Sequence, residues 1–390
     1  MLRHVISAAV ACALSTTASA AVMSVDSLNR SVSGSANGVA WQARSLMVGQ
    51  TSTLTIPSGG DPIYLPTRPQ KDGLGFLEIT GAGYCSGSLM ADGRHIVTAA
   101  HCLADSSGNP VATGGFAYFY NGPEDPLYDL DFGSTPGIER VAIDAYFLAP
   151  GYTGDVIDHN DVAIIRLSGS APDFATRYLL GDTSDLTGEE LNVAGFGNRG
   201  SSGATGASPG SFGRLREGDN RFEYRFGDPD FGTGWASILG EPFDQISHSW
   251  VSDFDRVGFA ANDTSCITVG AFFGLGGPKF CDTGIGPREV GVAGGDSGGP
   301  QFLNGRIVSV TSYGLTFGAG FGDFGGGLNS GWGEFSGYAP LYLQRGWIES
   351  LVPGAFGNGT PVPEPSTWAL TVIGLGLAGA AARRRKLASI

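Results

Sequence analysis

Short apolar runs separated by glycine and other turn residues fill the chain from about Gly75 onward. Short strands with such frequent turn signals are typical of all-β sandwiches and barrels. A helical period of apolar positions appears only near the end, over residues 341–351. The pattern therefore predicts an all-β fold that ends in a helix. The predicted strands are residues 76–79, 95–98, 116–120, 141–145, 162–167 and 191–194.

Two long stretches break this pattern of strands. Residues 198–261 are rich in glycine, aspartate and aromatic residues, and residues 314–337 combine glycine with phenylalanine and tryptophan. Such composition is typical of surface loops, which also carry many binding residues. We expect both stretches to be loops near the functional site, and in a second interpretation aromatic side chains such as Trp235 and Trp332 line substrate subsites.

The N-terminal end has the pattern of a secretory signal. Arg3 precedes an apolar run over residues 5–14, and Ala18-Ser19-Ala20 is a small-residue cleavage pattern. Residues 1–20 are therefore predicted to be a signal peptide, so the protein is exported. The polar residues 21–72 are interpreted as a propeptide or accessory segment, with an extra surface segment or a disordered lead as alternatives. We expect a main domain over residues 73–352 and a linker over residues 353–361.

The C-terminal end carries a second sorting pattern. Val362-Pro363-Glu364-Pro365 precedes an uncharged run over residues 367–382, which is followed by Arg383-Arg384-Arg385-Lys386. As a helix this run would be about 24 Å long, short for a bilayer core of about 30 Å but workable with snorkelling arginines. Residues 362–386 resemble the PEP-CTERM sorting signal of Gram-negative bacteria. The resemblance implies recognition by an exosortase, removal of the tail, and delivery to the envelope or outside; a permanent anchor is the alternative.

The net charge of the chain limits the classes of partner that it can bind. The formal net charge is −14 at pH 7, which argues against binding to nucleic acids or anionic membranes, apart from the C-terminal helix before processing. No glycine-rich phosphate loop or zinc constellation occurs, so no cofactor and no metal ligand are expected. Glu124, Asp125, Asp129 and Asp131 offer oxygen atoms suited to Ca²⁺, but a solvated acidic loop is the preferred interpretation.

Candidate chemistry begins at Gly294-Gly295-Asp296-Ser297-Gly298-Gly299-Pro300. Glycine allows backbone turns that other residues resist, which leaves the Ser297 hydroxyl accessible as a nucleophile. The amides of Gly295 and Ser297 can then stabilise negative charge on a carbonyl oxygen under attack. An ordinary glycine-rich turn is the alternative for this motif taken alone.

A serine nucleophile needs a base, and two further motifs supply a candidate base and its partner. His101 ends the run Ile96-Val97-Thr98-Ala99-Ala100-His101-Cys102, and Asp161 stands before the apolar run 162–167. An isolated histidine of this kind is more often a buried core residue. Because the three motifs follow the order His, Asp, Ser, we expect His101, Asp161 and Ser297 to form a catalytic triad.

These motifs together resemble the chymotrypsin/trypsin-type serine endopeptidases over about residues 75–351. The resemblance also rests on Cys85-Ser86-Gly87, Gly195-Phe196-Gly197-Asn198 and Ser312-Tyr313-Gly314. It implies two six-stranded β-barrels with the triad in the cleft between them. It further implies that a protein or peptide substrate is cleaved through an acyl-enzyme intermediate.

The cysteines are assigned by the same resemblance. Cys12 leaves with the signal peptide, and the remaining four cysteines allow three pairings by sequence alone. The family pattern implies Cys85 with Cys102 and Cys266 with Cys281. Export makes such bridges permissible, because secreted proteins fold in oxidising compartments.

Substrate specificity is also approached through the family pattern. The position of the pocket floor is Gly291, with Val292 beside it, so the carboxylate that selects Arg or Lys in trypsin-like relatives is missing. Ser312, Tyr313 and Gly314 are expected to form one wall, whereas the opposite wall near Gly337 is expected to be open. We expect a neutral, apolar residue before the scissile bond (P1).

Activation follows the family pattern only in part. Zymogens of this kind are cleaved before an Ile-Val-Gly-Gly-like start, whose amino group pairs with the acid before the nucleophile, here Asp296. No such start follows Arg44, Arg68 or Lys71. Two alternatives therefore stay open: hydrolysis of esters by the same triad, and a non-catalytic protease-like module that binds a surface polymer through its aromatic loops.

Overall fold

The computed structural model describes residues 25–26, 29–30, 32–36, 39–44, 48–56, 59–122 and 137–357. The predicted signal peptide, the acidic stretch from Glu124 to Asp131 and the predicted transmembrane sorting helix lie outside these ranges. Within them, no helix has the length and apolar character needed to cross a membrane.

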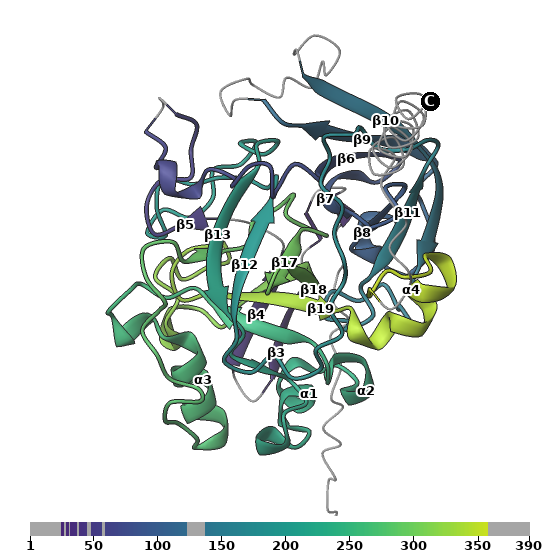
Figure 1. Ribbon diagram of the computed structural model, residues 1–390. Coiled ribbons are helices and arrows are strands. Elements are labelled where there is room, and N and C mark those ends of the chain that lie inside the picture. Colours follow the sequence, from purple (N-terminus) through teal and green to yellow (C-terminus); the bar gives the residue numbers. More distant parts are fainter. Residues whose placement is uncertain are drawn as a thin grey trace, which may run out of the picture.

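The first half of the fold is a closed antiparallel barrel of six strands in the order β10-β11-β8-β7-β6-β9 (Figure 1). Its interior is filled by apolar side chains at alternate strand positions, such as Leu77, Ile96 and Ile165. Five of the six runs predicted as strands fall in this barrel. The strands are β6 (Leu74–Thr80), β7 (Gly83–Leu89), β8 (His95–Thr98), β9 (Gly114–Tyr120), β10 (Ile138–Leu148) and β11 (Ala163–Leu167).

The second half is a nine-stranded sheet, not the second six-stranded barrel that was expected. Its main path is β13-β12-β17-β18-β19-β15-β14, and β4 pairs with both β18 and β3. The N-terminal segment contributes two of the nine strands, β3 and β4, and its strand β5 pairs separately with β16. The strands are β3 (Val32–Ala36), β4 (Val39–Arg44), β5 (Val48–Gly49), β12 (Glu190–Gly195), β13 (Arg216–Arg221), β14 (Tyr224–Arg225), β15 (Trp250–Asp253), β16 (Val290–Gly291), β17 (Pro300–Leu303), β18 (Arg306–Thr316) and β19 (Phe335–Pro340), and β1 (Val25–Asp26) pairs with β2 (Asn29–Arg30) apart from it.

Residues 198–261 are not the surface loops that were expected, because they include β13, β14, β15 and two short helices. Their aromatic side chains pack on one another: the rings of Tyr224 and Trp235 stack with centroids 5.8 Å apart. Trp235 is fully buried, so it does not line a substrate subsite. The helices are α1 (Gly234–Leu239), α2 (Phe243–Ile246), α3 (Thr264–Phe273) and α4 (Arg345–Leu351), with 3-10 turns η1 (Pro62–Tyr64), η2 (Ala100–Cys102), η3 (Pro229–Phe231), η4 (Ala260–Asn262), η5 (Ala319–Phe321) and η6 (Tyr342–Gln344).

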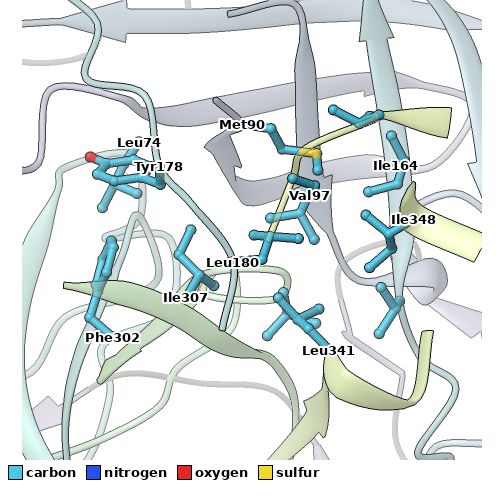
Figure 2. Packing of buried hydrophobic residues seen from close by; sticks show 14 of the residues in the cluster. Leu74, Met90, Val97, Ile164, Tyr178, Leu180, Phe302, Ile307, Leu341 and Ile348 are labelled. Atoms are coloured by element: carbon cyan, nitrogen blue, oxygen red, sulfur yellow. The ribbon is translucent and has the colours of Figure 1, made fainter. Parts of the chain in front are cut away.

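One continuous apolar cluster joins the two halves and the C-terminal helix. Figure 2 shows Val97 and Ile164 from the barrel facing Leu180 and Leu341, with Ile348 of α4 beside Ile164. The predicted C-terminal helix is therefore present, and it packs against both halves. This shared core fixes the relative position of the strands that carry the candidate site.

Residues 48–72 are packed on the second half of the fold. Tyr64 is fully buried and donates a hydrogen bond from its hydroxyl to the Pro287 carbonyl at 2.8 Å. The Thr53 amide donates to the Gly200 carbonyl at 2.9 Å, and Val48 pairs with Gly291 between β5 and β16. These contacts make the segment part of the folded body.

Candidate active site

His101 is held in place by the barrel and by a disulfide. It lies in η2, directly after β8, and its neighbour Cys102 is bonded to Cys85 of β7. Its amide donates to Asp161 Oδ1 at 2.8 Å, and its ring Nδ1 lies 2.6 Å from Asp161 Oδ2. Two contacts with one carboxylate fix both the backbone and the ring, and the ring contact engages Nδ1 rather than Nε2.

Asp161 is buried with an exposed fraction of 1% and has a third donor, the Ser312 hydroxyl, 2.6 Å from its Oδ2. Burial by itself would raise the pKa of this carboxyl, but the His101 ring and the hydrogen bonds of His101 and Ser312 outweigh it and lower the pKa. The side chain is thus ionised at neutral pH and suited to support a protonated imidazole.

Ser297 lies in the turn between β16 and β17, which belongs to the second half and contacts the barrel. Gly295 and Gly298 have φ values of 98° and 76°, which only glycine adopts without strain. A Cβ at Gly298 would lie 2.0 Å from Thr98 Oγ1, so glycine is needed for the turn to approach the strand that leads to His101. The Ser86 amide of β7 also donates to the Ser297 carbonyl at 2.8 Å. The turn therefore brings Ser297 against the segment that carries His101.

The amide of Gly295 has no acceptor among the described residues, as an oxyanion-binding donor requires. The turn beside it is anchored by Asp296, whose two carboxylate oxygens accept from the amides of Gly197 and Ala293, each at 2.8 Å. Asp296 is fully buried, and this burial raises its pKa despite the bond from Gly197. Asp296 thus links the turn to the loop after β12.

Among the expected substrate residues, Gly291 ends β16 and Val292 follows it, whereas Ser312, Tyr313 and Gly314 lie on β18. A Cβ at Gly291 would lie 3.1 Å from the Phe254 ring, so an apolar side chain lies directly behind the position that was expected to be the pocket floor. The space at Gly337, where an open wall was expected, is filled by the ring of Tyr313: a Cβ there would lie 2.2 Å from the ring. Tyr313 is itself buried, and its hydroxyl bonds to Ser249 Oγ at 2.7 Å.

Several serines that support this site were not predicted. Ser86 Oγ donates to the Gly295 carbonyl at 2.7 Å and accepts from the Phe196 amide at 3.0 Å, so it ties the nucleophile turn to the barrel. Ser336 Oγ accepts from the Val292 amide at 3.0 Å, and Ser330 Oγ donates to the Val292 carbonyl at 2.9 Å. The adjacency of Ser86 to Cys85 was a usable signal; the distant Ser330 and Ser336 gave none.

Both disulfides implied by the resemblance are present. Cys85 bonds to Cys102 and Cys266 bonds to Cys281, closing separations of 17 and 15 residues. The thiol sulfurs beside His101 are therefore consumed in a bridge and are not available as metal ligands together with its imidazole.

Comparison with protein families gives two matches. Residues 67–211 match the trypsin family model. The chain contains a trypsin-family domain. The match includes His101 and Asp161 and ends before Ser297. Residues 361–386 match the PEP-CTERM protein-sorting motif, and none of the curated proteins matches the chain.

A trypsin-family domain supports serine peptidase chemistry in general, and it implies a protein substrate. The fold is trypsin-like, with one closed six-stranded barrel and a half-barrel. The PEP-CTERM motif indicates export to the cell envelope or surface of a Gram-negative bacterium, and it implies recognition by an exosortase-type sorting system.

Proposed function

We propose that this protein is a serine endopeptidase in which Ser297 is the nucleophile, His101 the general base and Asp161 the group that orients His101. The observation that carries the proposal is the double contact of Asp161 with His101, at 2.8 Å and 2.6 Å, beside a glycine-rich turn that presents Ser297. A carboxylate, an imidazole and a hydroxyl in this order define the triad mechanism.

The reaction follows from the roles of these groups. Ser297 Oγ attacks the scissile carbonyl while His101 accepts its proton, and His101 then delivers that proton to the leaving amine. The amides of Gly295 and Ser297 donate to the oxyanion, each worth about 3 to 4 kcal/mol of transition-state stabilisation in comparable sites. Water then attacks the acyl-enzyme, and Ser297 regains its proton. No cofactor enters this sequence.

We propose a neutral, apolar P1 residue. Gly291 brings no carboxylate to the pocket floor, and the Phe254 ring lies directly behind it. A buried Arg or Lys of the substrate would therefore lack a partner there, which costs several kcal/mol for a charge. A peptide panel tests this proposal: faster cleavage after Arg or Lys than after apolar residues would contradict it.

The N-terminal strand β4 supports a propeptide role for the residues before Val48. It pairs with the edge of β18 directly after Ser312, at Gly314↔Arg44, Leu315↔Ala43 and Thr316↔Gln42. An extended peptide binds a sheet edge through the same backbone hydrogen bonds. We therefore propose that β4 occupies the edge along which substrate lies, and that it leaves when the chain is cleaved between β4 and β5.

The boundaries of the remaining parts are proposed on the same basis. Because residues 48–72 pack on the second half, the mature enzyme retains them, and the catalytic domain extends to residue 352. The tail from residue 362 is removed by the sorting system; retention of the tail as an anchor is the competing outcome. Export through residues 1–20 delivers the chain to the compartment where its disulfides form.

The deciding experiment uses the full-length chain expressed in an oxidising compartment, with Ser297→Ala as the control, a fluorophosphonate probe, and mass spectrometry of both termini. We expect labelling of the wild-type chain alone, and faster peptide turnover in molecules whose N-terminus begins after Arg44. Folded, disulfide-bonded wild-type protein that stays unlabelled after limited proteolysis would support the non-catalytic binding module instead. A ratio of ester to protein turnover far above that of ordinary peptidases would favour an esterase.

A further inference from the structure

Three aspartates meet inside the second half of the fold, away from the triad. Asp253 ends β15, Asp255 follows two residues later, and Asp263 caps the start of α3. One carboxylate oxygen from each lies within 4.8 Å of the others. All three residues are buried, with exposed fractions of 4% or less. Buried carboxylates this close repel one another unless protons or a cation compensate them.

The hydrogen bonds available to these aspartates are too few. Asp253 Oδ2 accepts from the Ser265 amide at 2.8 Å, and Asp263 Oδ1 accepts from the Cys266 amide at 2.7 Å. Asp255 is only 1% exposed, and its Oδ1 has no hydrogen-bond partner among the described residues. Neither water at the surface nor the described part of the protein therefore satisfies this oxygen. The neighbouring Ser265 Oγ is likewise buried without a partner. Unpaired polar atoms of this kind point to a ligand that the protein chain does not supply.

The charges around the cluster do not compensate it. Glu223, Asp282 and Glu289 also act on it, and the nearby cation Arg221 is bonded to Asp282 at 2.8 Å. Burial first, and the neighbouring carboxylates second, raise the pKa of Asp255 to about 12. Burial also raises the pKa of Asp263 to about 7 and that of Glu289 to about 8. Arg221 is engaged with Asp282 and, among the described residues, does not pair with the three aspartates.

We propose that Asp253, Asp255 and Asp263 bind a divalent cation of the calcium type. The available atoms are all oxygens, which Ca²⁺ prefers, and Ca²⁺ accepts six to eight of them at about 2.3–2.6 Å in flexible geometry. Ser265 Oγ offers a further oxygen, and water completes the shell. The nearby sulfurs of Cys266 and Cys281 are bonded to each other, so they do not provide the thiolates that zinc favours.

The position of the cluster gives the cation a structural role near the substrate pocket. Phe254, between Asp253 and Asp255, backs the pocket floor at Gly291. Gln50 of the N-terminal segment donates from its side-chain amide to the Asp255 carbonyl, and Trp332 Nε1 donates to Gln50 Oε1 at 3.0 Å. The cation thus holds β15 and α3 together through Asp253 and Asp263. Phe254 and Gln50 connect this point to the pocket floor and to the loop after η5.

The sequence predicts no metal ligand, and its one stretch with spacing suited to Ca²⁺ runs from Glu124 to Asp131. That stretch provides the matched control. The full-length chain carrying Ser297→Ala, which prevents self-cleavage, is stripped with EDTA and titrated with CaCl₂ by calorimetry. Bound calcium is counted by elemental mass spectrometry, and thermal unfolding is recorded with and without CaCl₂. The variants are Asp255→Asn in the cluster and Asp129→Asn/Asp131→Asn in the acidic stretch.

We expect the parent chain to gain thermal stability in CaCl₂ and Asp255→Asn to lose that gain together with at least tenfold in calcium affinity. Without calcium, Asp255→Asn should unfold at the same temperature as the parent or higher, because it removes an uncompensated buried acid. Asp129→Asn/Asp131→Asn should keep the calcium effect.

Absence of calcium binding by the parent at millimolar CaCl₂ would overturn the proposal. Loss of binding in Asp129→Asn/Asp131→Asn together with its retention in Asp255→Asn would also overturn it. If Asp255→Asn fails to fold, Asp263→Asn serves as the second variant with the same expected loss. All these readouts are independent of peptidase activity.

Discussion

Asp161 and Asp255 are both buried aspartates with exposed fractions of 1%, yet their surroundings differ sharply. Asp161 accepts hydrogen bonds from the His101 amide, the His101 ring and the Ser312 hydroxyl, and its pKa is lowered. Asp255 Oδ1 has no donor among the described residues, and its pKa is raised to about 12. The comparison teaches that burial alone does not decide whether a carboxyl works as an anion. The His101 ring and the hydrogen-bond donors lower the pKa of Asp161, whereas burial and the neighbouring carboxylates raise that of Asp255.

The largest expected effect comes from neutralising the well-partnered acid. Asp161→Asn should lower kcat by about 10⁴, the loss known for this substitution in the triad template, because the amide no longer holds the reactive tautomer of His101. Steady-state kinetics on a peptide substrate measure it, with the exposed Glu190→Gln as the control. A loss below tenfold would show that Asp161 does not orient His101.

Removing each disulfide in turn should show that the site of Asp161 and the cluster of Asp255 respond independently. Cys266→Ala/Cys281→Ala should lower the free energy of unfolding by about 3 kcal/mol and weaken calcium binding, because Asp263 caps the helix that carries Cys266. Cys85→Ala/Cys102→Ala should cost a similar amount of stability but reduce probe labelling of Ser297 instead. The two double variants are compared by denaturant unfolding, by calorimetry and by their rates of probe labelling. Equal calcium affinities in the two variants would contradict a coupling between the Cys266–Cys281 bridge and calcium binding.

The pH dependence of calcium binding should follow the raised pKa values. Calcium must displace the protons held by Asp263, whose pKa is about 7, and by Asp255, so affinity should rise at least tenfold from pH 6 to pH 8. Without calcium, stability should fall as pH rises above about 4, because the folded state then binds more protons than the unfolded state. Calorimetry and thermal unfolding across this range test both slopes, and a flat affinity would argue against these ligands.

The smallest effect should follow the removal of a single partner from Asp161. Ser312→Ala removes the hydroxyl 2.6 Å from Oδ2 but leaves both His101 contacts, so kcat should fall only about five- to tenfold. The acidic limb of the pH–rate profile should move to higher pH, because the carboxylate loses a stabilising donor. An unchanged profile would show that Ser312 serves only the packing of β18.

Local patterns predicted much of the fold. The strand runs from Phe76 to Ala194 and the C-terminal helix are present, because each is set by the alternation or period of its own apolar residues. The residues between 198 and 261 were misread as loops. Their glycines and aspartates resemble turn signals, whereas the aromatic packing of Tyr224 on Trp235 depends on tertiary contacts.

The candidate site shows the same division. His101, Asp161 and Ser297 stand in recognisable motifs, so the sequence alone predicts them, and the structure places His101 in contact with Asp161. The supporting serines and the aspartate cluster gather residues from distant segments, which no local pattern reveals. The contribution of β4 to the second half was missed for the same reason, since its pairing with β18 joins residues about 270 positions apart.

That pairing also has a consequence for the order of events during export. A chain that crosses the inner membrane from its N-terminal end presents β4 outside before β18 has been translocated. Because β4 is already exported when β18 folds, it can pair with β18 at once. The edge beside Ser312 is then covered as soon as it forms. Under the proposed function, the newly exported molecule folds with β4 in the position of a substrate. Other exported proteins are then not cleaved until β4 dissociates from β18.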